Sequence, residues 1–441
     1  MQFPTLREPI ERLIGAALAA VDPYHLTRHS LRREGEVWLL GRHRFDPRHG
    51  RLFLVATGKA AVPMAHAAAH ILGDALHEGI VITKRGHSLH PLAEGAYPLR
   101  LFEAGHPVPD EASVAATTAV LEMLAQTTAD DTVLCLISGG TSALLSQPRL
   151  PLAAWQTLNE ALLASGATIQ ELNSVRQQLD EVKGGGLARA AAPATCITLI
   201  LSDVVGNPLS LIGSGPTIPN PASPERASEI LARHGLLTAE LTPLLVKPTP
   251  LASSPRTAVV VGDVSTAARA AAEEAQGWGW ETRLLTTHLE GEAREVGKMA
   301  AALAKNAAPR TCLILGGETT VTLSDSTGKG GRNTELALAA GMALEGVWGA
   351  AVATFATDGD DGNSGAAGAI ATGETMRLAR QQGLDPLDFL NRHDSGSFFA
   401  HLPHTLLNTG PTGTNVNDLL FILSGVEWGC GMRNEKPPTN H

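Results

Sequence analysis

Two cations and three glycines lie together between Gly328 and Asn333, a composition suited to holding an anion. This segment follows a short apolar run, residues 313–315, that ends in Gly316-Gly317-Glu318 and is typical of a buried strand. A helix is expected to begin near Arg332, so backbone N–H groups, the positive helix end and the guanidinium would face one anion. The pattern predicts a phosphate site, although a solvated Gly-rich turn has the same composition.

Polar and Gly-rich segments also follow the expected strands in the first half of the chain. One such segment is ordinary turn chemistry, but parallel strands bring their carboxyl ends to one edge of a sheet, where ligands bind. The pattern therefore predicts a shared ligand-binding edge. Its five segments are Gly58-Lys59, Gly105-His106-Pro107, Ser138-Gly139-Gly140-Thr141-Ser142, Ser202-Asp203 and Gly213-Ser214-Gly215-Pro216-Thr217.

Three aspartates, Asp358, Asp360 and Asp361, occur within four residues after the apolar run 350–356. Carboxylate oxygens are hard ligands, which suits a Mg²⁺ ion carried in with a nucleotide. A flexible acidic turn is the alternative interpretation. The segment is a poor match to an EF-hand calcium loop, because no helix-flanked loop ending in Glu follows.

Strands that alternate with helices must position these residues. Strands are expected near 36–40, 51–56, 79–83, 99–103, 132–137, 196–201, 257–261, 281–285, 313–315, 319–323 and 350–356, with a last one ending at 423. Helices are expected near 5–21, 111–126, 152–165, 168–180 and 291–305. This alternation predicts an α/β protein with a mainly parallel sheet covered on both faces.

A Pro-rich stretch around Pro243, Pro248, Pro250 and Pro255 indicates a domain boundary. We therefore expect an N-terminal domain over residues 1–253, a smaller C-terminal domain over 254–426, and a disordered tail over 427–441.

Composition narrows the functional class. The 441 residues carry a formal net charge of -10 and 4% aromatic residues, which disfavours nucleic acid or an anionic membrane as a partner. No run reaches transmembrane length, the N-terminus does not resemble a signal peptide, and the four cysteines are not spaced as a metal or redox site. We expect a cytoplasmic protein.

Several common motifs are missing. The sequence contains no G-x-x-x-x-G-K-[ST], no strand-associated G-x-G-x-x-G with a carboxylate about twenty residues further on, and no G-x-S-x-G or H-E-x-x-H. A P-loop enzyme and a standard dinucleotide site are therefore not supported.

Together the motifs resemble the class II glycerate 2-kinases, a family whose members also carry a hydroxypyruvate reductase label. The resemblance covers residues from about 10 to 423, in the family's order. It rests on Gly58-Lys59-Ala60-Ala61, Gly105-His106-Pro107-Val108-Pro109-Asp110, Ser138-Gly139-Gly140, Asn173-Ser174-Val175-Arg176, Val182-Lys183-Gly184-Gly185-Gly186, Ser202-Asp203-Val204-Val205-Gly206, Gly213-Ser214-Gly215-Pro216-Thr217, Gly316-Gly317-Glu318-Thr319-Thr320-Val321, Gly328-Lys329-Gly330-Gly331-Arg332-Asn333, Thr357-Asp358-Gly359 and Thr412-Gly413-Thr414-Asn415-Val416-Asn417-Asp418.

The resemblance implies ATP-dependent phosphorylation of D-glycerate at its 2-hydroxyl, in a cleft between a Rossmann-like N-terminal domain and a smaller α/β domain with a mixed sheet. It implies ATP and Mg²⁺ as cofactors and a monomer or homodimer. Lys59 would neutralise the transferring phosphoryl group, and Arg332 would bind that group or the glycerate carboxylate. Asp203 or Glu318 would orient the attacking hydroxyl or hold the metal.

The remaining candidate residues divide by ligand. Nucleotide contacts are expected from Ser138, Gly139, Gly140, Thr141, Ser142, Lys183, Gly184, Gly185 and Gly215; substrate contacts from His106, Arg176, Lys329, Asn333 and Asn415; and metal contacts from Asp358 and Asp361.

The sequence departs from the family pattern at four positions. Thr141 replaces a usual third glycine, Asn207 a frequent aspartate, Gly365 a further aspartate of the acidic loop, and Gly396 a usual aromatic. Two alternatives remain open. One is an NAD(P)H-dependent hydroxypyruvate reductase, which would need the dinucleotide fingerprint that is missing; the other is a sugar-acid-binding protein without catalysis on the same fold, for which Gly365 is the only hint.

Overall fold

The computed structural model describes residues 3–35, 37–40, 43–46, 50–88, 97–219, 223–246, 256–323 and 328–425. The expected tail at 427–441 and most of the Pro-rich stretch lie outside these residues. The chain forms two compact units. The parallel-sheet unit comprises Leu18–Ala267 and Pro411–Asn417; the mixed-sheet unit comprises Met1–Ala17, Ala268–Gly410 and Asp418–His441.

This division differs from the expected boundary near residue 254. Strand β9 (Arg256–Gly262) pairs in parallel with β8 (Thr195–Leu201) and so completes the first sheet. Most of helix α1 (Phe3–Ala20) belongs to the mixed-sheet unit, and residues near the end of the chain return to the parallel-sheet unit. A change in composition along the sequence does not reveal that the chain passes from one unit to the other more than once.

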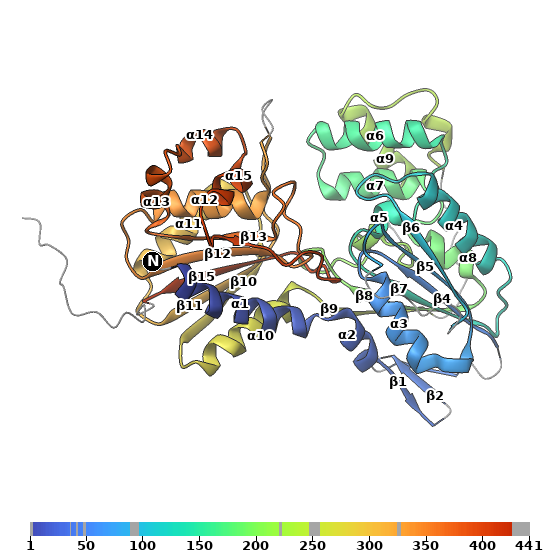
Figure 1. Cartoon of the computed structure of the whole chain (residues 1–441). Coiled ribbons are helices and arrows are strands. Elements are labelled where there is room, and N and C mark those ends of the chain that lie inside the picture. The colour runs from blue at the N-terminus through green and yellow to red at the C-terminus, as the bar shows by residue number, and fades with distance from the viewer. Residues whose placement is uncertain are drawn as a thin grey trace, which may run out of the picture. The chain divides into compact units, whose positions relative to one another are not determined.

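Six strands, all parallel, form the first sheet in the order β6-β5-β4-β7-β8-β9 (Figure 1). The chain runs outward from β4 through β5 to β6, and then outward on the other side through β7, β8 and β9. The switch point of the sheet therefore lies between β4 and β7, where ligands of such sheets bind. The remaining bounds are β4 Leu52–Thr57, β5 Leu76–Lys84, β6 Leu99–Ala104 and β7 Thr132–Ile137.

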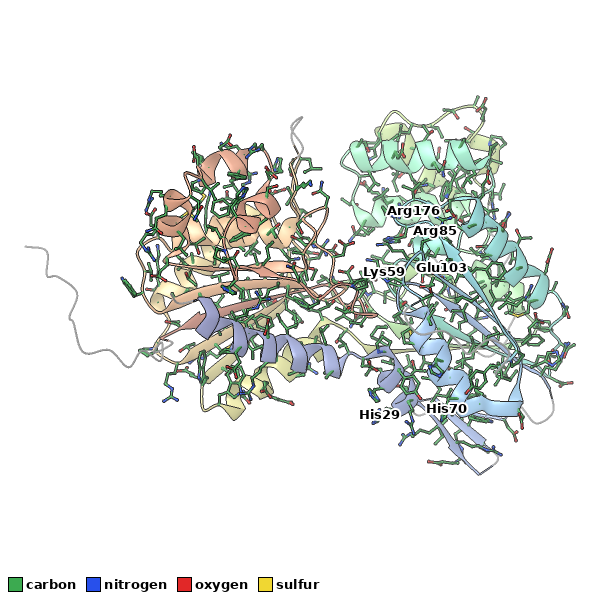
Figure 2. The ribbon with its side chains drawn as sticks, in the orientation of Figure 1. His29, Lys59, His70, Arg85, Glu103 and Arg176 are labelled. Carbon is green, nitrogen blue, oxygen red and sulfur yellow. The ribbon has the colours of Figure 1, made fainter. Side chains whose placement is uncertain are left out.

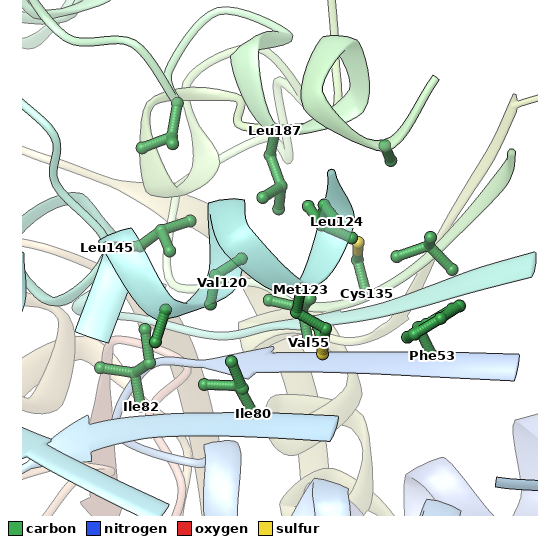
Figure 3. Close-up of a cluster of buried hydrophobic side chains, with 14 of the residues drawn as sticks. Phe53, Val55, Ile80, Ile82, Val120, Met123, Leu124, Cys135, Leu145 and Leu187 are labelled. Atoms are coloured by element: carbon green, nitrogen blue, oxygen red, sulfur yellow. The ribbon is translucent and has the colours of Figure 1, made fainter. Parts of the chain in front are cut away.

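The central strands are buried on both faces because helices cover them. Every residue of β4 and of β7 is buried, as the near-continuous apolar runs predict. Figure 3 shows part of one core layer, in which Val120 and Met123 of α4 pack with Val55 and Ile80 of the sheet. The helices of this unit are α2 Pro23–Ser30, α3 Ala61–Leu72, α4 Glu111–Leu124, α5 Thr141–Leu144, α6 Leu152–Ala164, α7 Ile169–Leu179, α8 Gly186–Ala191 and α9 Pro224–Arg233.

A small antiparallel sheet of β1 (Leu31–Glu34), β2 (Val37–Leu40) and β3 (His43–Phe45) belongs to the same unit. In the part of the chain that the structure describes, no helix is long and apolar enough to cross a membrane.

The second unit is built on a mixed sheet in the order β10-β11-β15-β12-β13-β14. Among the described strands, β10 and β11 pair in parallel, and the other neighbours pair antiparallel. The bounds are β10 Glu281–Leu289, β11 Thr311–Gly317, β12 Ala350–Ala356, β13 Gly368–Thr372, β14 Leu406–Leu407 and β15 Asp418–Ser424. The helices are α10 Val264–Gly277, which begins just before the unit boundary, α11 Ala293–Asn306, α12 Arg332–Ala343, α13 Thr375–Gln381, α14 Pro386–Asn391 and α15 Ser395–Ala400.

The two α/β units, one built on a parallel sheet and one on a mixed sheet, confirm the predicted fold class. Two local predictions are wrong. Residues 319–323 do not form a strand: Thr320 makes one isolated bridge, and the Glu292 carboxylate accepts the N–H of Thr322 instead of a neighbouring strand. Residues 213–217 begin within a short 3-10 turn, Ile212–Ser214, and do not come directly after a strand.

Candidate active site

Lys59 lies in the tight turn between β4 and α3 (Figure 2), at the switch point of the parallel sheet. Its N–H donates to the carbonyl of Gly139 at 2.8 Å, and the next N–H, of Ala60, donates to Ser138 Oγ at 3.1 Å. Gly58 has φ +120°, and a Cβ there would lie 2.1 Å from Ser138 Oγ. The turn that presents Lys59 therefore requires glycine and is fastened to the loop after β7.

The loop from Ser138 to Ser142 brings several predicted residues together. A Cβ on Gly139 would lie 2.2 Å from Asp203 Oδ2 and 2.5 Å from Asn415 Nδ2. A Cβ on Gly140, where φ is +91°, would approach the His106 ring at 3.1 Å and Lys59 Cγ at 3.4 Å. These glycines thus leave room for polar side chains that arrive from four separate segments of the chain.

Asp203 and Asn415 form a polar pair beside this loop. Asn415 Nδ2 donates to Asp203 Oδ2 at 3.3 Å, although the two residues are 212 positions apart in the sequence. Residues Pro411–Asn417 belong to the parallel-sheet unit, so Asn415 reaches Asp203 within one unit. The carboxyl edge of this sheet therefore carries a Gly-rich loop with a cation, Lys59, and a carboxylate, Asp203, each lying against it.

Lys183 occupies a different position from the one expected. Its side chain is only 1% exposed, and Nζ donates to the carbonyls of Ser142 at 2.8 Å and Leu145 at 2.9 Å, beside Asp180 Oδ2 at 3.5 Å. Burial, partly offset by the charge of Asp180, lowers the pKa of Lys183. The Lys183 ammonium is therefore not positioned to contact a nucleotide directly. Its hydrogen bonds to the carbonyls hold the end of the Ser138–Ser142 loop in place.

The glycines after Lys183 are also used internally. The N–H of Gly184 donates to the carbonyl of Ser214 at 3.0 Å, and that of Gly185 donates to Gly215 at 2.7 Å. These bonds join two predicted nucleotide segments to each other, so the N–H groups of Gly184 and Gly185 support the site and do not point at a phosphate. Ser214 continues the support through Ser142 Oγ at 2.8 Å.

Arg176 is held within the helical layer of the same unit. Its Nε donates to Asn159 Oδ1 at 2.6 Å, and burial lowers the pKa of the guanidinium, an effect that the charge of Asp180 partly offsets. The structure thus binds Arg176 to Asn159 and places it near enough to Asp180 for the two charges to interact, so part of this guanidinium, expected to contact substrate, is used within the protein.

Arg332 is the central cation of the mixed-sheet unit, where it is the first residue of α12. Nε and Nη2 donate to the two carboxylate oxygens of Asp418, and Nη1 donates to Glu318 Oε1 at 2.7 Å. Burial alone would lower the pKa of Arg332, but the charges of Asp418 and Glu318 raise it above its usual value. The guanidinium is permanently charged and has one edge fully engaged.

The segment that precedes Arg332 is held by its backbone. Lys329 N–H donates to Asp394 Oδ1 at 2.8 Å, and Gly330 N–H donates to Asn363 Oδ1 at 2.7 Å. The Lys329 carbonyl accepts the N–H of Gly396 at 2.8 Å. The Lys329 side chain is exposed, so a fixed backbone presents a solvated cation.

Asp361 does not fit the expected role of metal ligand. Oδ1 accepts the N–H of Asn333 at 2.9 Å and Oδ2 accepts that of Thr334 at 2.8 Å, so both oxygens cap the first turn of α12. Burial raises the pKa of Asp361 to about 6, and the charge of Asp418 adds to this effect. Asn333, expected to contact substrate, is buried in the same cap.

Asp358 remains a partly exposed carboxylate at the end of β12, and its Oδ1 accepts the N–H of Asp360 at 3.1 Å. Among the residues that the structure describes, no three His, Cys, Asp or Glu side chains gather in a way that could hold a metal ion.

Asp418 is a site residue that the sequence reasoning did not select, although it ends one of the quoted motifs. It is the first residue of β15, which pairs antiparallel with both β11 and β12, opposite Gly317 and Ala356. The start of β15 therefore lies at the same edge as the ends of β11 and β12. The signal that could have found it is a carboxylate at the beginning of an antiparallel strand.

Three of the four departures from the family pattern have local contacts. Thr141 Oγ1 donates to the carbonyl of Thr57 at 2.9 Å, which ties the loop to β4. Asn207 Nδ2 donates to Asp263 Oδ2 at 2.6 Å, where an aspartate would bring two carboxylates together. A Cβ on Gly396 would lie 2.8 Å from the Lys329 carbonyl, so a larger side chain has no room. Gly365 has φ +76°, and a Cβ there would meet nothing within 4 Å, so no contact explains this fourth departure.

Comparison with known proteins identifies the family. Residues 9–245 match the family model described as a domain of unknown function, DUF4147, and residues 311–418 match the MOFRL family. The chain is 41% identical over 383 residues to a D-glycerate 2-kinase of Thermotoga maritima, covering 85% of this chain and 90% of that protein. The chain belongs to the glycerate 2-kinase family.

A second comparison supports this family assignment. A crystal structure of a glycerate kinase from Thermotoga maritima matches with a TM-score of 0.83 and 38% identity, covering 96% of this chain and 100% of that chain. A relative from Agrobacterium vitis, 39% identical over 437 residues and covering 95% of this chain and 94% of that protein, has the provisional name of a hydroxypyruvate reductase. The glycerate 2-kinase family thus contains members under both names.

Proposed function

We propose that the protein transfers the γ-phosphoryl group of ATP to the 2-hydroxyl of D-glycerate, giving 2-phosphoglycerate and ADP. The observation that carries this proposal is the group at the switch point of the parallel sheet, where Lys59 and Asp203 both lie against the Ser138–Ser142 loop. Phosphoryl transfer needs positioned charges around the moving group more than it needs covalent chemistry. Membership of the glycerate 2-kinase family supports glycerate as the acceptor and ATP as the donor.

The residues of the parallel-sheet unit have distinct proposed roles. Lys59 neutralises the oxygens of the transferring phosphoryl group, while the Ser138–Ser142 loop provides its backbone for nucleotide phosphates. Asp203 accepts a hydrogen bond from the acceptor hydroxyl and orients it for attack, with Asn415 fixing the carboxylate at 3.3 Å. His106, next to Gly140, lies within the same group and contacts the substrate.

In the mixed-sheet unit, Arg332 and Lys329 are the proposed anion-binding cations. The Nε and Nη2 edge of Arg332 is already bound to Asp418, so the proposed contact of an incoming anion is with Nη1, which donates to Glu318 Oε1 at 2.7 Å in this structure. Arg332 is therefore proposed to bind the phosphoryl group or the glycerate carboxylate through that side, and not through the full fork that the sequence suggested.

Magnesium enters the proposal as part of the substrate, MgATP. The predicted pair of ligands does not fit, because both oxygens of Asp361 accept N–H groups of α12. Asp358 is left as a single carboxylate candidate. Mg²⁺ that is held mainly by phosphate oxygens and water is the usual arrangement in nucleotide-dependent enzymes.

The test is phosphorus NMR of the purified protein with D-glycerate, ATP and Mg²⁺. The expected result is a 2-phosphoglycerate signal that requires ATP, glycerate and the metal. The position of the new phosphate signal distinguishes the 2-hydroxyl from the 3-hydroxyl. A folded protein that gives no phosphorylated glycerate would contradict the proposal.

The hydroxypyruvate reductase name of the Agrobacterium vitis relative makes this activity the second candidate. The same protein preparation with NADH or NADPH and hydroxypyruvate, without ATP, tests it by absorbance at the nicotinamide band. We expect no oxidation, because the sequence contains no dinucleotide fingerprint after a strand.

A further inference from the structure

Arg332 binds two carboxylates that differ in burial and geometry, and this difference leads to an inference about the proposed reaction. The side chain of Asp418 is 10% exposed, whereas that of Glu318 is 46% exposed and that of Arg332 is 33% exposed. Asp418 engages two nitrogens of the guanidinium and Glu318 engages one. One contact is built into the sheet, and the other lies at the solvent boundary.

The sheet fixes the backbone from which the Asp418 carboxylate reaches Arg332. The backbone of Asp418 is paired on both sides, opposite Gly317 of β11 and Ala356 of β12. A carboxylate held in this way, with two parallel bonds to an arginine, fixes the plane of the guanidinium. Its contribution is therefore orientation of Arg332.

Glu318 holds Arg332 less firmly. It follows the last residue of β11, and its carboxylate accepts a bond of 2.7 Å from Nη1 of Arg332 on a side chain that is nearly half in solvent. Exposed ion pairs of this kind are worth little, because water competes for both partners. The Nη1 atom is also the nitrogen that is left for a ligand, and a carboxylate is the group that D-glycerate carries.

We infer that the two carboxylates have opposite roles: Asp418 is a positioning residue for Arg332, and Glu318 is an internal competitor that an anionic substrate displaces from Nη1. This inference rests on the proposed function. Glu318 occupies Arg332 when no substrate is present, and a weakly bound ambient anion gains little by replacing it. A substrate that also contacts other residues of the site replaces Glu318 readily. When product leaves, Glu318 again accepts the hydrogen bond from Nη1 of Arg332.

The competitor role of Glu318 is tested by whether removing its charge tightens or weakens the binding of D-glycerate. With the full-length protein, calorimetry gives the Kd of D-glycerate for the wild type and for Glu318→Gln. An exposed pair of this type corresponds to about twofold to fivefold in affinity, so the variant should bind D-glycerate about twofold to fivefold more tightly. The matched control is Glu281→Gln, which removes an exposed Glu–Arg pair with Arg283 in the same unit and should leave the Kd unchanged.

The effect must act through Arg332. In an Arg332→Lys background, the same Glu318→Gln change should no longer tighten binding, because the single bond to Nη1 is absent. Unchanged or weaker binding in Glu318→Gln would overturn the competitor role, as would an equal gain in the Arg332→Lys background. A wild type that neither binds nor phosphorylates D-glycerate would instead overturn the proposed function, so the two failures are distinguishable.

The positioning role of Asp418 has its own readout. Asp418→Asn should lower kcat by about tenfold to a hundredfold with a smaller change in KM, because the charge of Arg332 is kept and its orientation is lost. Thermal unfolding of the variant verifies that it is folded. A folded Asp418→Asn protein with unchanged kcat would overturn this half of the inference.

Discussion

Several residues with proposed roles lie just after the ends of strands, where the sheet fixes the backbone that carries the side chain. Lys59 is the clearest example, because β4 is buried at every position up to Thr57 and the following turn is fastened to the loop after β7. Lys59 is only 9% exposed, so a buried turn holds this lysine at the end of the strand.

Replacing Lys59 with alanine is expected to lower kcat by about 10²- to 10³-fold, because one preorganised cation is lost from the transition state. The measurement is steady-state phosphorylation of D-glycerate, with thermal unfolding as the check on folding. Lys298→Ala is the control, since Lys298 pairs with Glu295 on the exposed surface of α11. If Lys59→Ala turned over substrate at the wild-type rate, Lys59 would have no part in catalysis.

At the scale of elements, the start of α12 combines a proposed anion-binding cation with a buried helix cap. Arg332 is its first residue, and the Asp361 carboxylate accepts N–H groups from the next two. A Cβ on Gly331 would lie 2.3 Å from Asp361 Oδ1, so the glycine before the helix allows this buried cap to approach. The glycines near Arg332 therefore serve the helix start as much as a ligand.

Asp361, which caps α12, is expected to make the free energy of unfolding depend on pH. Burial raises the pKa of Asp361 to about 6 in the folded protein, above the ordinary value of 3.8. A raised pKa means that this group contributes stability below about pH 4 and that the contribution is lost as pH rises to about 6. The loss is up to about 3 kcal/mol in the free energy of unfolding, from about two pKa units.

The measurement is the melting temperature of the wild type and of Asp361→Asn at several pH values between 4 and 7. The stability of the wild type relative to the variant should fall as the pH rises through this range, because asparagine does not titrate. The exposed neighbour Asp360→Asn is the control and should show no such trend. A difference between wild type and Asp361→Asn that is constant with pH would refute the argument.

The same elements show what the sequence could predict. The buried strands β4, β7 and β8 are continuous apolar runs, and the rule that ligands bind at carboxyl ends selected Lys59, Ser138 and Asp203, which the structure brings together. Hydrophobic patterning is enough for this, because it depends on local sequence and parallel strands bring their carboxyl ends to one edge of the sheet.

Other residues could not be placed in this way. Asp418 begins an antiparallel strand, so only the pairing of β15 with β11 and β12 reveals its position beside Arg332. Lys183 and Asp361 carry charges that suit a ligand, but their partners are backbone groups of distant segments. Whether a charged side chain faces a ligand or the backbone depends on tertiary contacts, which spacing does not encode.

At the scale of the whole molecule, a chain with a formal net charge of -10 is proposed to bind two anions. The overall field opposes this binding, so the attraction must come from local cations on fixed turns and helix starts. Each ligand that binds the folded state and not the unfolded chain stabilises the whole protein by an amount set by its affinity.

MgATP is therefore expected to raise the melting temperature, by an amount equivalent to about 2.7 kcal/mol at a concentration a hundred times its Kd. For units of this size such a stabilisation corresponds to a rise of several degrees. NADH at the same concentration should produce no comparable rise, because no dinucleotide fingerprint is present in the sequence. Stabilisation by NADH and not by MgATP would favour the reductase. Stabilisation by MgATP alone would support the proposed nucleotide binding, and this result does not depend on which acceptor substrate the protein uses.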